Sequence, residues 1–200
     1  MKTPLRYQIT EFDCGSISLL NCLSFLFERE EIPAELVRII STYTLECYDE
    51  NGELGSGVTT RSMMKFIAKW VELFAEEKGI PLKCKYLTAQ AVSPYAIAKC
   101  LKEGGCVNLR TFNGTEHYVT LTAVDDEYVY LFDPYYKTAG EYKNNAHIEY
   151  IDGHPFTFNR RVKIEYFVAD EQLEFALGPI EKREAMLFFR DDSTLMNQLG

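Results

Sequence analysis

The sequence predicts an α+β protein in which N-terminal helices pack on a C-terminal antiparallel sheet. Apolar residues before Gly104 recur mainly at helical spacing, whereas from Gly105 onward they alternate with polar residues in short runs. Helical and strand patterns that are separated along the chain are typical of the α+β class. The chain has 200 residues, 46% of them hydrophobic, which is enough to bury a sizeable core without disulfides or a metal ion.

Two helices are expected near the N-terminus. Residues 14–29 are apolar on most faces, which predicts a central, buried helix, and Asp13 is placed to be its N-cap. Pro33, at a first-turn position, opens a second helix that runs to about Tyr43. The stretch 48–60 is polar and rich in glycine, so we expect a long loop there and regard it as a candidate lid.

Two more helices and one strand complete the first half. A threonine of the pair 59–60 caps a third helix, which runs to Lys78 and stops at the glycine that follows. Residues 81–87 are predicted to form a strand. The Ser-Pro pair 93–94 opens a fourth helix that ends at the glycines 104–105.

Short strands dominate the second half. Three of them are joined by tight turns, and two further runs are strand candidates: 106–112, 117–124, 127–133, 162–169 and 185–190. The segment from 134 to 161 shows no clear pattern. Because there is no internal repeat and no low-complexity linker, residues 1–200 are predicted to form a single domain, with 137–200 as a candidate extension of it.

Composition excludes several classes of protein. A net charge of −9 and the lack of a basic run argue against nucleic-acid and membrane-surface partners. We see neither the apolar core of a signal peptide nor an apolar run that could span a bilayer, so a soluble, cytoplasmic protein is expected. The six cysteines form no C-x-x-C pair and there are only three histidines. Free thiols, no metal site and no cofactor are therefore expected.

Cys14 is the strongest candidate for a reactive group. It lies in the first turn of the predicted buried helix, where the positive end of the helix dipole stabilises a thiolate. Gly15 beside it is predicted to leave room for a substrate backbone. Because a charged Asp13 would oppose ionisation of the thiol, a further activating group is required.

A histidine held by a carboxylate could supply that activation. His117 begins one strand of a predicted hairpin and Asp133 ends the other, so the hairpin brings the two residues together. The negative charge that develops on the substrate oxygen in the transition state needs hydrogen-bond donors of its own. The backbone N–H of Cys14 is one, and the side-chain amide of Gln8, six residues upstream, is a second.

These spacings resemble a known pattern. The combination Gln-x5-Cys with His-x15-Asp is similar to the papain superfamily, and the string Q-I-T-E-F-D-C-G before an apolar helix most resembles the C39 and C39-like peptidases. The resemblance covers roughly residues 7–27 and 105–136. It implies a papain-like cysteine peptidase fold, with a nucleophile, a base, an orienting acid and an oxyanion-hole amide at Cys14, His117, Asp133 and Gln8 respectively.

A second histidine and aspartate have the same separation. His154 and Asp170 are also sixteen residues apart, but His154 lies in a turn-like D-G-H-P string without the hairpin context. A histidine in such a turn is ordinarily a solvated loop residue, so we prefer His117. The alternative reading of Cys14 itself is an inert, buried thiol that serves only packing.

The sequence therefore favours a cysteine peptidase or amidase that cleaves a peptide or small amide or acyl substrate through a thioester. An acyltransferase or transpeptidase with the same three groups remains an alternative, because the acceptor is chosen by the shape of the cleft. A non-catalytic binding module on the same scaffold is the third hypothesis. The sequence does not determine the oligomeric state.

Overall fold

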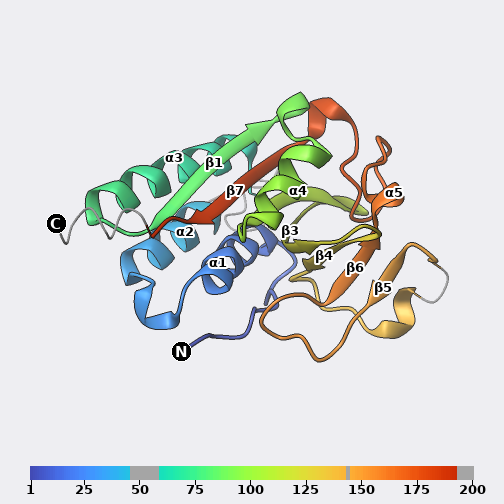
Figure 1. Ribbon diagram of the computed structural model, residues 1–200, viewed down its shortest axis with the longest axis horizontal. Helices are drawn as coiled ribbons and strands as arrows, with labels where there is room; N and C mark the ends of the chain where they lie inside the picture. The colour runs from blue at the N-terminus through green and yellow to red at the C-terminus, as the bar shows by residue number, and fades with distance from the viewer. Residues whose placement is uncertain (46–58, 143–144, 193–200) are drawn as a thin grey trace.

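The computed structural model describes residues 1–45, 59–142 and 145–192, and it is an α+β fold as predicted (Figure 1). Seven antiparallel strands form one sheet in the order β1-β7-β2-β3-β4-β6-β5. The strands are β1 Leu82–Thr88, β2 Cys106–Asn113, β3 Thr115–Val124, β4 Tyr128–Phe132, β5 Ile148–Tyr150, β6 Arg160–Lys163 and β7 Glu184–Arg190. The predicted loop 48–60, our candidate lid, lies almost entirely outside the described residues.

Helices cover both faces of this sheet. The three longest pack together against one face, and the others lie beyond the opposite face or along the connections. The α-helices are α1 Cys14–Leu26, α2 Ala34–Leu45, α3 Arg61–Lys78, α4 Pro94–Lys102 and α5 Ile164–Phe167. Single 3₁₀ turns are η1 Arg29–Glu31, η2 Ala89–Ala91, η3 Ala139–Tyr142 and η4 Ile180–Lys182.

Each face of the sheet has its own core. Alternation along a strand sends neighbouring residues to opposite faces. On β7, Met186 packs with α1, α2 and α3, while Leu187 packs with α4 and the α5 region. The same division separates Cys106 from Val107 on β2. The central strands are thus buried on both sides, which fixes their positions tightly.

Local signals set the helix boundaries. Thr60 is the N-cap of α3, where its hydroxyl accepts a hydrogen bond from the Met63 N–H at 3.3 Å. Gly79 ends the same helix in the left-handed region, at φ 64°. Ser93 caps α4 in the same way as Thr60 caps α3. These boundaries agree with the sequence predictions because they depend only on residues within one helical turn.

Asp13 differs from its predicted role. It occupies the N-cap position of α1, but its carboxylate accepts no hydrogen bond from the helix. It turns back and accepts from the backbone N–H groups of Ile9 and Thr10, at 3.1 and 3.0 Å, and from the Thr10 hydroxyl. The prediction of a capping side chain was therefore wrong, because the preceding loop competes for the carboxylate more successfully than the helix does.

The predicted strand 162–169 is also wrong. The chain pairs with β4 only as far as Lys163, which lies opposite Tyr128, the first residue of β4. Beyond that point β4 offers no further partner, and the chain turns into the short helix α5. The helix buries Phe167 against the core.

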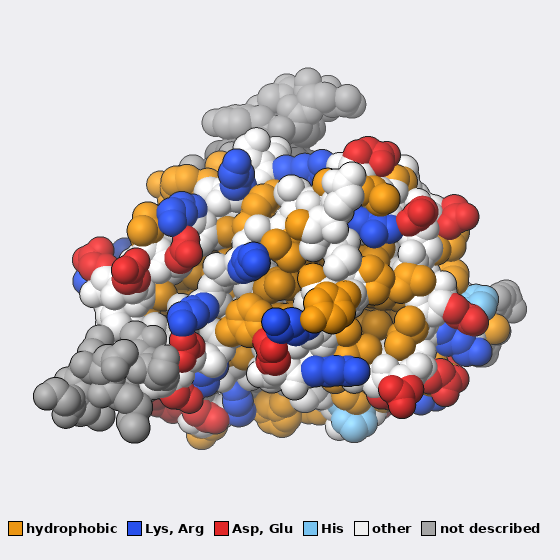
Figure 2. All heavy atoms as spheres, turned by 45° about the horizontal axis from the view of Figure 1, so that its top comes forward, with side chains coloured by type: hydrophobic (Ala, Val, Ile, Leu, Met, Phe, Trp, Pro, Cys, Tyr) orange, Lys and Arg blue, Asp and Glu red, His pale blue; other side chains and the backbone are white. Residues whose placement is uncertain are grey.

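The surface shows no concentration of one charge on the face drawn in Figure 2, where acidic and basic side chains are interspersed. In the described ranges, no helix combines the length and the apolar character that a bilayer crossing requires. Five cysteines fall within these ranges, and all five are free thiols; Cys47 lies outside them.

Candidate active site

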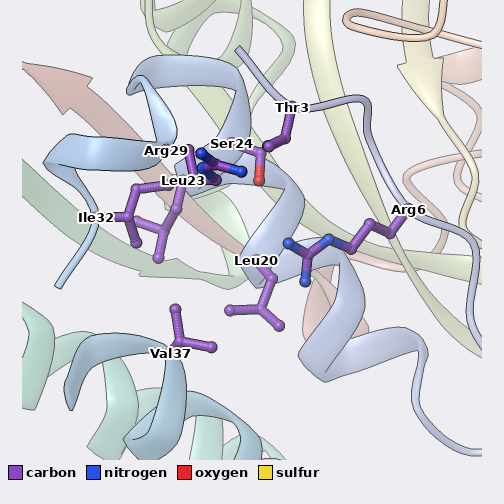
Figure 3. A pocket seen from close by; sticks show the side chains of 8 residues that line it. All are labelled: Thr3, Arg6, Leu20, Leu23, Ser24, Arg29, Ile32 and Val37. Atoms are coloured by element: carbon purple, nitrogen blue, oxygen red, sulfur yellow. The ribbon is translucent and has the colours of Figure 1, made fainter. Parts of the chain in front are cut away.

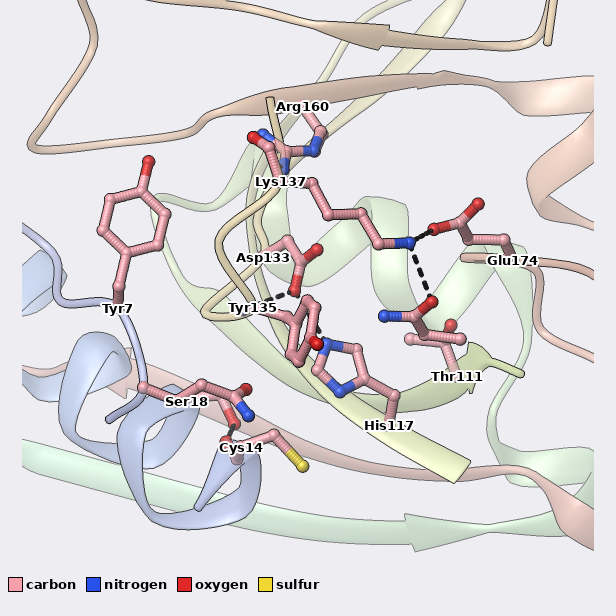
Figure 4. Close-up of polar contacts among 12 residues, drawn as sticks. Tyr7, Cys14, Ser18, Thr111, His117, Asp133, Tyr135, Lys137, Arg160 and Glu174 are labelled. Atoms are coloured by element: carbon pink, nitrogen blue, oxygen red, sulfur yellow. Dashed lines mark hydrogen bonds and ion pairs between the residues drawn. The ribbon is translucent and has the colours of Figure 1, made fainter. Parts of the chain in front are cut away.

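Three elements meet at the candidate site. They are the start of α1, the strand β3 and the end of β4. Cys14 begins α1, His117 lies on β3, and Asp133 follows the last residue of β4. All three side chains are buried, with residue exposures of 4%, 6% and 0%. In Figure 4 the Cys14 sulfur and the His117 ring lie on the same side of the α1 N-terminus.

His117 and Asp133 form a close polar pair. The ring Nε2 lies 2.7 Å from the carboxylate Oδ1, a distance typical of a charge-assisted hydrogen bond. The Tyr135 backbone N–H donates to the same oxygen at 2.9 Å. With Nε2 engaged by the carboxylate, Nδ1 is the ring nitrogen that remains for the Cys14 sulfur.

Opposing effects set the pKa of His117. Burial disfavours the imidazolium and lowers the pKa, but the charge and hydrogen bond of Asp133, together with the interaction with Cys14, outweigh it. The result is a pKa raised to about 10. At neutral pH the ring is therefore a cation beside the sulfur atom.

A chain of buried hydrogen bonds fixes α1 against the sheet. The Ser18 hydroxyl donates to the Cys14 carbonyl at 2.6 Å and accepts from the Asn108 side chain on β2 at 2.8 Å. Thr120, three residues beyond His117 on β3, donates its hydroxyl hydrogen to the Ser18 carbonyl at 2.9 Å. Ser18 thus couples the helix that carries Cys14 to the strand that carries His117.

Gln8 immediately precedes Ile9 and Thr10, whose backbone N–H groups donate to the Asp13 carboxylate. Its backbone N–H donates to the Pro134 carbonyl at 2.9 Å, which ties this segment to the residue after Asp133. The side-chain Nε2 donates one hydrogen to the Thr10 carbonyl at 2.7 Å, and its second hydrogen remains for another acceptor. Within the described residues, the contacts of Gln8 thus leave one amide hydrogen uncommitted.

A side chain at position 15 would collide with residues at the start of α3. A Cβ atom at this position would come within 2.5 Å of the Thr59 hydroxyl oxygen and 3.1 Å of the Met64 side chain. Since Thr59 immediately precedes the α3 N-cap, the missing side chain lets the start of α1 approach α3. This packing is a further reason for a glycine at position 15, and the predicted room for a substrate stays a prediction.

A pocket of about 410 Å³ gives access to the candidate site. Cys14 and His117 both line it, and Tyr135 lies beside His117 with the two rings edge to face and their centroids 6.4 Å apart. Lys137, which also lines the pocket, is paired with Glu174 at 2.5 Å (Figure 4). The rest of the lining is polar or acidic except for one phenylalanine: Glu11, Phe12, Asn113, Thr115, Glu116 and Glu141.

Two other hollows among the described residues lack the combination of a cysteine and a histidine. The one in Figure 3 lies between the N-terminal segment, α1 and α2, with two arginines over an apolar floor. Its volume is only about 110 Å³, and neither a cysteine nor a histidine lines it. The larger groove of about 660 Å³ beside α3 and β1 contains the thiol of Cys84, but burial raises the pKa of that thiol far above its ordinary value.

The alternative pair His154 and Asp170 is engaged elsewhere. His154 is exposed and stacks on Phe158, with ring centroids 4.5 Å apart. Asp170 forms an ion pair with Arg183 at 2.5 Å. Within the described part of the chain, no ion pair joins this histidine to this aspartate.

Sequence reasoning missed the residues that support the site. Ser18, Asn108 and Thr120 are fully or almost fully buried polar residues, and each stands between two apolar residues in the sequence. That contrast was available in the sequence, because a polar side chain at a core position needs a specific hydrogen-bond partner. The identity of the partner was not available.

Comparison with known proteins gives structural matches only. No family model and no curated protein matches the sequence. Among solved structures, a protein named as a C39-like peptidase from Bacillus anthracis is 16% identical with a TM-score of 0.48, over 93% of this chain and 94% of that one.

Two further structures are of the same kind. The peptidase domain of Streptococcus mutans ComA is 12% identical with a TM-score of 0.39, over 94% of this chain and 99% of that one. A double glycine motif protease from an AMS/PCAT transporter, solved in complex with the leader peptide, is 16% identical with a TM-score of 0.39, over 92% and 89% of the two chains.

Proposed function

We propose that this protein is a cysteine peptidase or amidase that cleaves a peptide or small amide through a thioester on Cys14. The observation that carries the proposal is the 2.7 Å hydrogen bond between His117 and the buried Asp133, beside a cysteine at the start of a helix. An imidazolium next to a sulfur and a helix N-terminus both favour the thiolate, which is the nucleophilic form.

In the first step the Cys14 sulfur attacks the carbonyl carbon of the substrate. A C–S bond forms, and the carbonyl oxygen becomes an oxyanion. That oxygen accepts hydrogen bonds from the Cys14 backbone N–H, which has no acceptor within the helix, and from the free hydrogen on Gln8 Nε2.

In the second step the C–N bond breaks. His117 gives the Nδ1 proton to the leaving amine, so the amine departs neutral and a thioester remains. Asp133 holds the ring in one orientation and stabilises its charge in the first step. Water then attacks the thioester while His117 takes its proton, and the collapse of the second oxyanion releases the acid and the Cys14 thiolate.

Thiol labelling tests the proposal. We expect iodoacetamide to alkylate Cys14 at pH 7 faster than it alkylates glutathione, with the label mapped by mass spectrometry. His117→Ala should bring that rate down to the glutathione level. A thiol-directed peptide probe should label the parent protein and not Cys14→Ala. If Cys14 reacts no faster than glutathione, the proposal fails.

A further inference from the structure

Asp133 lies just beyond the regular sheet. The pairing between β4 and β6 ends at Leu131 and Arg160, and β4 itself ends at Phe132. The backbone of Asp133 therefore has no strand partner, although the residue is completely buried. An unpaired buried N–H or C=O group would be costly, so something else must satisfy both.

The side chain of Asn159 supplies both missing bonds. Its Oδ1 accepts from the Asp133 N–H at 2.8 Å, and its Nδ2 donates to the Asp133 carbonyl at 2.9 Å. Its own backbone N–H donates to the Leu131 carbonyl at 3.0 Å. The side-chain amide thus acts as an extra peptide group that extends the ladder by one residue, in a position where Asn159 is only 4% exposed.

The Asp133 carboxylate has few contacts of its own. Oδ1 accepts from His117 Nε2 and the Tyr135 N–H, while Oδ2 is buried and accepts no hydrogen bond from the described residues. The direction of the carboxylate is therefore set largely by the backbone that carries it. We propose that Asn159 is a positioning residue, which holds the Asp133 peptide so that Oδ1 points at His117; this inference rests on the proposed function.

Asn159 also connects the acid to the other side of the candidate site. Its Nδ2 lies 3.3 Å from the Tyr7 hydroxyl, and Tyr7 immediately precedes the candidate oxyanion residue Gln8. The buried Arg160 adds two hydrogen bonds beside Asn159. Its guanidinium donates to the Asn159 carbonyl at 2.9 Å and to the Lys137 carbonyl at 3.4 Å. The loop that follows Asp133 is thereby tied to β6 (Figure 4).

Replacing Asn159 by alanine removes both side-chain hydrogen bonds to the Asp133 backbone, while every proposed catalytic residue is still present. We expect Cys14-dependent turnover to fall by about 10- to 100-fold, the size of loss that small misplacements cause. The ¹⁵N-imidazole titration of His117 by NMR should move to lower pH, because the carboxylate no longer faces the ring as closely.

Val162→Ala is the matched control. Val162 is a fully buried residue on β6, the strand that begins directly after Asn159. Its truncation therefore weakens the fold without removing a contact to Asp133. We expect an unchanged His117 titration in this variant. If Asn159→Ala does not fold, Asn159→Ser, which can still satisfy one of the two backbone groups, replaces it with a smaller shift in the same direction.

The two proposals fail differently. A folded Asn159 variant with parental turnover and a parental His117 titration overturns the positioning role. An unreactive Cys14 in the parent overturns the proposed function instead, and the His117 titration still decides whether Asn159 directs Asp133.

Discussion

At the scale of single residues, the candidate site is governed by burial and its compensation. Removing a charged group from water is unfavourable unless an opposite charge or a hydrogen bond replaces the lost hydration. His117 has both in Asp133, together with the neighbouring Cys14 sulfur, and its pKa is raised to about 10 in spite of its burial. The same interactions that would activate a nucleophile therefore also contribute to the stability of the fold.

This coupling predicts a pH dependence of stability. The ordinary pKa of histidine is 6.5 and that of folded His117 is about 10, so the folded state retains a proton that the unfolded state loses. The stabilisation by His117 is complete below pH 6.5 and disappears as pH rises through about 10. We expect the difference in urea midpoint between the parent and His117→Gln to shrink over this range. A difference that stays constant between pH 6.5 and 10 contradicts the prediction.

A substitution at Gln8 distinguishes stabilisation of the oxyanion from activation of the Cys14 thiol. Gln8→Ala removes one proposed oxyanion donor, so turnover of an amide substrate should fall by about 10²- to 10³-fold. Alkylation of Cys14 by iodoacetamide forms no oxyanion and should proceed at close to the parental rate. A parallel loss of both activities would show that Gln8 supports the loop around Asp13 rather than the transition state.

At the scale of elements, the relation between α1 and the sheet decides whether the candidate groups meet. Ser18 is the point of attachment, because it bonds to the Cys14 carbonyl, to Asn108 on β2 and to Thr120 on β3. Gly15 allows the start of α1 to approach Thr59. The position of Cys14 therefore depends on polar contacts inside an otherwise apolar interface.

Ser18→Ala should be costly for this reason. The substitution leaves the buried Asn108 amide without its hydroxyl acceptor, and an unsatisfied buried donor costs about 1–3 kcal/mol. The double variant Ser18→Ala/Asn108→Leu removes both partners and should lose less stability than the sum of the two single variants. Urea denaturation of all four proteins measures this coupling; additive effects would mean that the hydrogen bond contributes little.

At the scale of the whole molecule, the last strand completes the first part of the sheet. β7 pairs with β1 on one side and with β2 on the other, so residues near the C-terminus separate two strands from the middle of the chain. β5 and β6 extend the same sheet beyond β4. Of the seven strands that the structure describes, three, namely β5, β6 and β7, thus come from the part of the chain after residue 137.

A chain shortened to residues 1–183 should therefore not fold cooperatively. Without β7, β1 loses its only strand partner in the described residues, and both cores lose a row of buried side chains. We expect a broad urea transition and weak near-ultraviolet circular dichroism, with the full chain as the reference. A sharp, parent-like transition would show that the C-terminal part is dispensable for the fold.

The sequence alone determined what depends on neighbouring residues. The caps at Thr60 and Ser93 and the stop at Gly79 act within one turn, so their patterns could be recognised directly. The hairpin of β3 and β4 is equally local, and its short turn explains why the spacing of His117 and Asp133 was enough to suggest that the two residues meet.

Only the tertiary structure decided the rest, because the deciding contacts join distant parts of the chain. No pattern within β7 itself predicted that it would lie between β1 and β2. The end of β6 was set by the length of its partner strand β4. Asp13 and Gly15 acquired their actual roles from a preceding loop and from the start of α3. The clamp of Asn159 on Asp133 spans 26 residues, and an amide can pair with a distant peptide only after the fold has brought the two together.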